Sequence, residues 1–320
     1  MKLMRYMDVK KYRDLLSTKT LFLPRYDNLG DMFEGSLGYV PAGKLIEQRT
    51  ERLKRITQMP QQGNTIAREF LEAFEPLFYH KFLRNFTFVS CWHQSEKESA
   101  LMWKMYAQKG VMIKSDLSSL KSSLGINANG YQRSNIFWQD HGIDNVNGYE
   151  ISVEVNKVKY LPHGTEIEAV GSDRYFHKQA EYEDEKELRI VLQLELGPQQ
   201  RANFPFEIDN SPLTHNEEEM HNLILRSWKS VERSHEKHSL VLNDILSEPG
   251  VRCRVDINSL IKEVIVNPFD SGDSDVSEIE SLNREFGLAA KVKKSVIETR
   301  KSPTTFSIKI SEGKTINFVL

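Results

Sequence analysis

Hydrophobic residues along this chain follow two spacings, and the change from one to the other divides it into strands and helices. The clearest example is segment 86–116, FTFVSCWHQSEKESALMWKMYAQKGVMIKSD. Alternation at Phe86, Phe88 and Ser90 predicts a strand that carries the Ser90 hydroxyl to its end. Apolar residues then recur at helical spacing and predict a helix that Gly110 ends, before a second strand. Such a junction is typical both of ligand pockets and of plain core, so both interpretations stay open.

The same two spacings predict the rest of the fold. Helices are expected at 9–16 with Asp8 as cap, at 117–124, and at 274–286 with Gly287 as stop. Strands are expected at 149–160, 188–194, 251–257, 263–267 and 291–297. Helical spacing within 44–82 and 216–247 predicts two helical insertions. The pattern therefore predicts an α+β protein with one domain over 1–300 and a C-terminal β-hairpin extension over 301–320.

Composition excludes several classes of protein but does not indicate a particular activity. The chain has 320 residues, 39% hydrophobic and 28% charged, with a net charge of −2, so disorder and a uniformly basic nucleic-acid-binding surface are both excluded. The two cysteines, Cys91 and Cys253, fall in apolar runs, which favours reduced thiols. The amino terminus is too polar for a signal peptide, and no run is long enough for a membrane helix. We therefore expect a cytoplasmic protein with no membrane partner.

An acidic run precedes one of the predicted strands. Five carboxylates lie between 181 and 187, directly before the alternating residues 188–194. In one strand register Glu185, Glu187 and Arg189 share a face, because alternate strand residues point the same way. Packed carboxylates repel one another unless a partner or a function offsets the repulsion, and Arg189 is a candidate partner. Both a solvated charged turn and a catalytic glutamate fit this pattern.

Other candidate sites are less specific. Asp27, Asp31 and Glu34 lie close together in the loop DNLGDMFEG, whose composition is also that of an ordinary turn. Cys91 and His93 would share a strand face as a nucleophile and its base, but no orienting group is evident. The histidines form no complete ligand pattern, and we expect no metal. The familiar nucleotide-binding and hydrolase motifs are absent from the sequence.

Six short pieces, taken in order, resemble the bacterial domain of unknown function 2971. They are the Arg5-Tyr6 start, LFLPRYDNLGDMFEG, FVSCWH with the following LMWKMYAQKGVMIKSD, VKY at 158–160, YEDEKELRIV, and LIKEVIVNP. Asp31, Phe33 and Glu34 match the family's N-D-P-F-E element, whereas Gly30 replaces its asparagine. The resemblance spans roughly residues 1 to 300 and by itself implies no activity.

The layout also resembles, more distantly, the ADP-ribosyltransferase fold of the Arg-Ser-Glu class. Arg5 on the first strand, Ser90 at the end of a middle strand and Glu185-Lys186-Glu187 before a late strand fill that pattern. The resemblance implies a split, mostly antiparallel mixed β core and NAD as substrate. In it Glu187 stabilises the developing cation, Glu185 orients the acceptor, and Ser90 holds Glu187. The side chains expected to contact NAD are Arg5, Tyr6, Asp31, Phe33, Trp103 and Tyr106.

Three functions follow as alternatives. The first is a NAD-dependent ADP-ribosyltransferase, a bacterial toxin or antiviral defence effector that modifies a protein or a nucleic acid and has a possible partner or antitoxin protein. The second is a non-catalytic binding or sensor domain of a defence system. The third is a metal-dependent nuclease that uses Asp31, Glu34, Glu185 and Glu187, because Mg²⁺ prefers clustered carboxylates.

Overall fold

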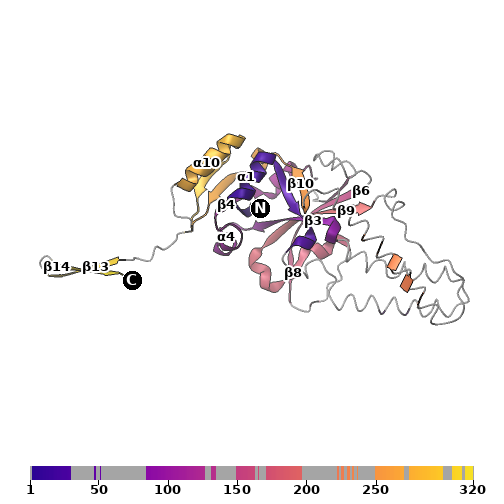
Figure 1. Cartoon of the computed structure of the whole chain (residues 1–320), viewed down its shortest axis with the longest axis horizontal. Coiled ribbons are helices and arrows are strands. Elements are labelled where there is room, and N and C mark those ends of the chain that lie inside the picture. The colour runs from indigo at the N-terminus through magenta and orange to yellow at the C-terminus, as the bar shows by residue number, and fades with distance from the viewer. Residues whose placement is uncertain are drawn as a thin grey trace, which may run out of the picture.

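The computed structural model describes the central sheet of the protein and the elements around it. The described residues are 2–29, 84–126, 149–162, 171–196, 249–269 and 274–297, the strands 131–134, 305–311 and 314–319, and isolated positions elsewhere. Eight of the described strands form one sheet in the order β12-β11-β4-β1-β3-β9-β6-β5. Every pairing in this sheet is antiparallel except that of β11 with β12. The expected mixed, mostly antiparallel sheet is therefore present (Figure 1).

The strands of the main sheet are β1 (Lys2–Asp8), β3 (Thr87–Gln94), β4 (Gly110–Asp116), β5 (Tyr131–Ser134), β6 (Tyr149–Lys157), β9 (Glu187–Leu196), β11 (Glu263–Val266) and β12 (Lys291–Lys294). Three small sheets pair β2 (Thr20–Pro24) with β10 (Gly250–Arg254), β7 (Lys159–Leu161) with β8 (His177–Gln179), and β13 (Thr305–Ser311) with β14 (Lys314–Val319). The described α-helices are α1 (Val9–Thr18), α4 (Ala100–Tyr106), α5 (Leu117–Ser123), α9 (Ile257–Leu260) and α10 (Ser274–Phe286).

The strands β1 and β3 diverge in the middle of the sheet. They share only the pairs Leu3↔Gln94 and Met4↔His93. On their outer sides, β1 pairs with β4 along its whole length, and β3 pairs with β9 from Thr87 to His93. Beyond Met4, the edges of β1 and β3 that face each other therefore form no ladder.

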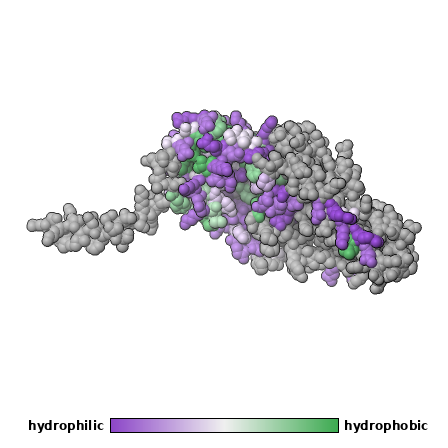
Figure 2. Space-filling model, in the orientation of Figure 1, coloured by the Kyte–Doolittle hydropathy of each residue, from purple (hydrophilic) through white to green (hydrophobic). Residues whose placement is uncertain are grey.

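Strand alternation separates the two faces of the sheet. One face packs on α1, α5, α9 and α10 and forms the largest core cluster, which includes Leu3, Trp92 and Ile190. On the opposite face, Met4 and Tyr6 pack under Met102 and Trp103 of α4. Figure 1 accordingly shows α1 and α10 on one side of the sheet and α4 on the other. The described surface in Figure 2 is mostly hydrophilic, with small separate hydrophobic areas.

Local signals placed several element ends correctly. The Asp8 carboxylate caps α1 by accepting a hydrogen bond from Lys11 N at 2.7 Å, and Gly287 follows α10 with a φ of 72°. Gly110 was expected to end a helix, but it is the first residue of β4. A Cβ atom there would lie 2.1 Å from the Met7 carbonyl oxygen, so the close approach of β1 requires glycine.

Several predictions concern residues that the structure describes sparsely or not at all. The described positions within the insertions 44–82 and 216–247 are helical, and the rest of both stretches lies outside the described residues. Asp31, Phe33 and Glu34 lie outside them as well. The strands of the terminal hairpin pair as expected, whereas the division into a domain over 1–300 and an extension stays a prediction. Among the helices that the structure describes, none is long and apolar enough to span a membrane.

Candidate functional site

A cavity of about 780 Å³ lies where β1 and β3 diverge. Side chains from β1, β3, α4, β8, β9 and the 3₁₀ helix η4 (Ala180–Glu185) line it. Of the residues that the sequence singled out, the cavity collects Arg5, Tyr6, Cys91, His93, Tyr106, Glu185, Glu187 and Arg189. Its size is in the range of small-molecule and cofactor sites. The tertiary structure thus brings most of the candidate residues to one place.

The two glutamates reach the cavity from different elements. Glu187 is the first residue of β9, whereas Glu185 is the last residue of η4, and Lys186 between them has a φ of 42°. The strand register that would put Glu185 on one face with Glu187 and Arg189 is therefore not formed, because the left-handed turn at Lys186 separates Glu185 from β9. They nevertheless meet at Lys178, whose Nζ lies 2.5 Å from Glu185 Oε2 and 3.3 Å from Glu187 Oε1.

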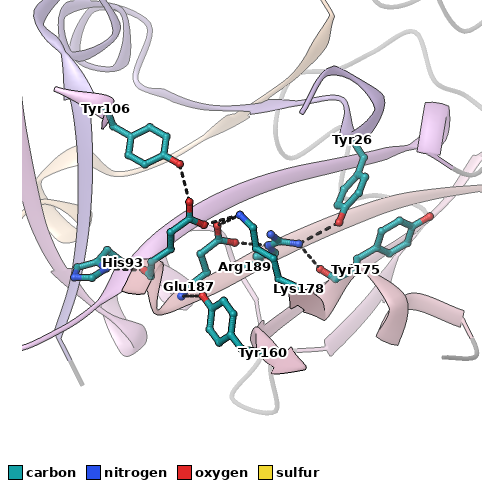
Figure 3. A network of polar contacts seen from close by, with 9 residues as sticks. Tyr26, His93, Tyr106, Tyr160, Tyr175, Lys178, Glu187 and Arg189 are labelled. Carbon is teal, nitrogen blue, oxygen red and sulfur yellow. Dashed lines mark hydrogen bonds and ion pairs between the residues drawn. The ribbon is translucent and has the colours of Figure 1, made fainter. Parts of the chain in front are cut away.

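Arg189 is the principal partner of Glu187, as the strand alternation predicted. Its Nε donates to Glu187 Oε2 at 2.5 Å. Its Nη1 donates to the Tyr26 hydroxyl at 3.1 Å and to the Tyr175 carbonyl oxygen at 2.8 Å. The Arg189 side chain is only 1% exposed, so this ion pair is enclosed in protein (Figure 3). Such a pair holds one carboxylate oxygen in a fixed direction.

The two carboxyl groups differ in their pKa values. Burial raises the pKa of Glu185, and the neighbouring Glu187 raises it further, although Lys178 opposes both effects. Burial acts on Glu187 in the same direction, but Arg189, the hydrogen bond with Glu185 and Lys178 together hold the pKa of Glu187 well below its ordinary value. Glu187 is therefore the ionised member of the pair, and Glu185 is the member that takes up a proton first.

Three ring side chains fix the position of this pair. The Tyr160 hydroxyl accepts a hydrogen bond from Glu187 N at 2.7 Å, and the Tyr106 hydroxyl donates to Glu185 Oε1 at 3.2 Å. His93 Nδ1 lies 2.6 Å from the Glu185 carbonyl oxygen, to which it can donate as the Nδ1–H tautomer. Burial lowers the pKa of His93, which favours the neutral ring. These contacts anchor both the backbone and the side chains of the pair (Figure 3).

Ser90 does not contact Glu187, contrary to the expectation. The register places Ser90 opposite Ile190 and Glu187 opposite His93, three positions apart along the strand pair. Because side chains alternate between faces, an odd separation puts the two residues on opposite faces of the sheet. The Ser90 hydroxyl instead accepts hydrogen bonds from Arg5 Nη1 at 2.9 Å and from Trp92 Nε1 at 3.1 Å.

Arg5 lies between the diverging strands, and its partners among the residues that the structure describes are all neutral. Besides Ser90, it donates from Nη2 to the Phe22 carbonyl oxygen at 3.3 Å, and its guanidinium lies 5.7 Å from the centre of the Trp92 ring. No Asp or Glu of the described residues forms an ion pair with it. Burial lowers the pKa of Arg5 to about 10, yet the group remains charged at neutral pH. Arg5 thus lines the cavity and carries a charge that no described carboxylate balances.

The expected aromatic contacts to NAD divide into two groups. Tyr106 lines the cavity and is 45% exposed, so its ring is accessible. Trp103 is fully buried and donates from Nε1 to Glu98, so it is a core residue and cannot stack on a ligand. Tyr6 lines the cavity, but it is buried and its hydroxyl accepts a hydrogen bond from Ser99 N at 3.0 Å. Its contribution is to hold the start of α4.

Two further expectations concern a nucleophile and a metal. Cys91 and His93 share the face that carries Glu187, and the Glu185 carbonyl oxygen supplies the orienting contact for His93 that the sequence did not reveal. In the part of the chain that the structure describes, no group of three or more His, Cys, Asp or Glu residues is placed to hold a metal ion. Asp31 and Glu34, the other half of the nuclease quartet, lie outside that part.

Sequence analysis missed Lys178 and Tyr160 as site residues. Tyr160 belongs to the VKY piece at 158–160, whose family resemblance assigns it no role at a site. Lys178 comes from the short strand β8, which carries no periodic signal of its own. No model of a known protein family, no curated protein and no solved structure matches this chain.

Proposed function

We propose that this protein is a NAD-consuming ADP-ribosyltransferase. The proposal rests on one observation above all: two adjacent carboxyl groups with opposite pKa shifts share a cavity with Arg5, whose charge no carboxylate among the described residues balances. Pairs of titratable groups whose environments separate their pKa values are typical of acid–base sites. The resemblance to the Arg-Ser-Glu class of transferases agrees in the order of Arg5, Ser90 and Glu187 along the chain.

In the proposed reaction the bond between nicotinamide and C1′ of the ribose breaks. Its electron pair leaves with nicotinamide, which becomes neutral, and the ribose passes through an oxocarbenium-like state. In this proposal the ionised Glu187 stabilises that developing charge electrostatically. Arg189 fixes one of its oxygens, so the direction of the carboxylate is set before the substrate arrives.

The acceptor then forms a bond to C1′ and loses a proton. Glu185 is suited to receive this proton, because its raised pKa makes it a better base than an ordinary glutamate. The accessible Tyr106 ring offers a stacking surface for the nicotinamide. Arg5 supplies a planar fork of donors for the pyrophosphate. The acceptor would be a protein or a nucleic acid of the bacterial cytoplasm, and the biological setting a toxin or antiviral defence system, controlled by a partner or antitoxin protein.

A second function is favoured by the charge balance around the pair. Lys178 and Arg189 together balance the two carboxylates, and all three ion pairs among them are largely buried. A fully balanced network of this kind is also what a non-catalytic binding or sensor domain would contain. In that case the cavity binds a ligand through Arg5 without cleaving it.

The test is the release of nicotinamide from NAD by the purified protein, with and without cell lysate as a source of acceptor. Glu187→Gln should abolish release, whereas Glu181→Gln, a change at an exposed glutamate of η4, should leave it unchanged. If the folded protein binds NAD by calorimetry but releases no nicotinamide, the binding-domain function replaces the transferase. If it neither binds NAD nor releases nicotinamide, the transferase proposal is refuted.

A further inference from the structure

The Lys178 ammonium lies in surroundings that would bind any small cation. Its Nζ contacts Glu185 Oε2 at 2.5 Å and Glu187 Oε1 at 3.3 Å, and it lies 4.4 Å from the centre of the Tyr182 ring. The lysine side chain is only 9% exposed. An aromatic face together with two carboxylates attracts positive charge from both sides. The position of Lys178 Nζ, between the two carboxylates and the Tyr182 ring, is therefore a subsite of the cavity that favours a cation.

Lys178 does not belong to the main sheet, which carries the Glu187 backbone. It lies on β8, which pairs with β7 in a separate two-stranded sheet. Both of these strands fall within the segment that connects β6 to β9, and β6 and β9 pair directly with each other over nine residues. The ammonium can therefore move away from the carboxylates without breaking a hydrogen bond of the main sheet. It sits at the end of a long flexible side chain, which makes such a movement easier.

We propose that Lys178 occupies, in the ligand-free protein, the subsite of a planar aromatic cation of the N-alkylpyridinium class, and that the ligand's ring displaces it. This proposal rests on the proposed function, because oxidised NAD carries such a ring. Exchange of one cation for another keeps the two carboxylates balanced. A neutral ring in the same place would leave them without the second positive charge, and buried unbalanced charge is costly.

Two consequences follow for substrate choice and release. The subsite should accept oxidised NAD, whose nicotinamide ring is cationic, and reject the reduced form, whose ring is neutral. Once the glycosidic bond breaks, nicotinamide is neutral as well, so Lys178 can return to the carboxylates as the product leaves. The Lys178 ammonium would thus compete reversibly with the ligand's cationic ring for the same subsite.

The first experiment compares two small probes by calorimetry, the cation 1-methylnicotinamide and neutral nicotinamide. Lys178→Met should bind the cation about tenfold more tightly than the wild type does, because the internal competitor is gone, and should gain nothing for the neutral probe. Lys178→Arg, which keeps a positive charge, is the matched control and should show no gain. Equal gains for both probes, or none, would overturn the proposal.

The second experiment uses the unaltered protein, so it does not depend on whether Lys178→Met folds. An amine-acylating reagent should modify Lys178 faster when 1-methylnicotinamide is bound, since displacement exposes the ammonium. Mass spectrometry of the labelled peptide measures the rate. Slower or unchanged labelling at saturating probe would contradict displacement. Neither experiment needs cleavage of NAD, so the cation subsite and the transferase activity can fail independently.

Discussion

Arg5 and Arg189 lie at the same cavity but on opposite faces of the sheet, and their surroundings differ in kind. Arg189 bonds the Glu187 carboxylate and two oxygens of tyrosine residues, so its charge is balanced. Arg5 bonds a serine hydroxyl and a carbonyl oxygen, and its charge is not balanced by any described carboxylate. The first arrangement is that of a structural partner that orients an acid. The second leaves a charge available for an anionic ligand.

The largest effect should come from breaking the balanced pair. Arg189→Met leaves the Glu187 carboxylate buried with Lys178 as its remaining cation, and we expect the free energy of unfolding to fall by about 3–5 kcal/mol in chemical denaturation. The double variant Arg189→Met with Glu187→Leu removes both charges and should recover part of this loss. If the losses in the free energy of unfolding from Arg189→Met and Glu187→Leu simply add in the double variant, the two residues are not coupled. Arg189 would then not be the structural partner of Glu187.

An intermediate effect should appear as the pH falls. The pKa of Glu187 is lower in the folded protein than in the unfolded chain, so its stabilisation is complete above the unfolded value and is lost as the pH falls through the folded value. The pKa of Glu185 is shifted upward, so its destabilisation at neutral pH is relieved as the pH falls toward the unfolded value. Stability should therefore first rise slightly and then fall.

Denaturation curves across the acidic range measure both parts of this profile. Glu185→Gln should remove the initial rise, and Glu187→Gln should reduce the later loss. Each unit of pKa shift changes the free energy of unfolding by about 1.4 kcal/mol, so the rise due to Glu185 and the fall due to Glu187 can be measured separately. A Glu187→Gln variant with the same acid profile as the wild type would show that Glu187 is not the ionised member of the pair.

The smallest effect on stability should come from Arg5. Arg5→Met removes two hydrogen bonds to neutral acceptors, and we expect a cost of about 2 kcal/mol or less. Its effect on ligand binding should be larger, with NAD affinity reduced about tenfold or more, because the pyrophosphate loses its counter-charge. Calorimetry with Arg13→Met, a change at an exposed arginine of α1, is the control. Unchanged NAD affinity in Arg5→Met would remove Arg5 from the site.

Sequence patterns predicted those features that depend on neighbours in the chain. Asp8 caps α1 through a contact three residues away, and Glu187 pairs with Arg189 because alternate strand residues share a face. The order of strands and helices around segment 86–116 followed from spacing in the same way. The predicted start of this strand at 188 lies one residue from the start of β9 at Glu187. The left-handed turn at Lys186, which separates Glu185 from the strand, was not predicted, because alternation carries no signal for it.

Which side chains from distant segments contact one another at the site was decided only by the tertiary structure. Whether Ser90 meets Glu187 depends on the register between β3 and β9, and a shift of one residue would have put them on the same face. Lys178 and Tyr160 reach the glutamates from the small β7–β8 sheet, so their role depends on how that sheet packs. The sequence by itself determined which elements form and which local pairs share a face. Register and packing decided which side chains meet, because they depend on contacts between segments far apart in the chain.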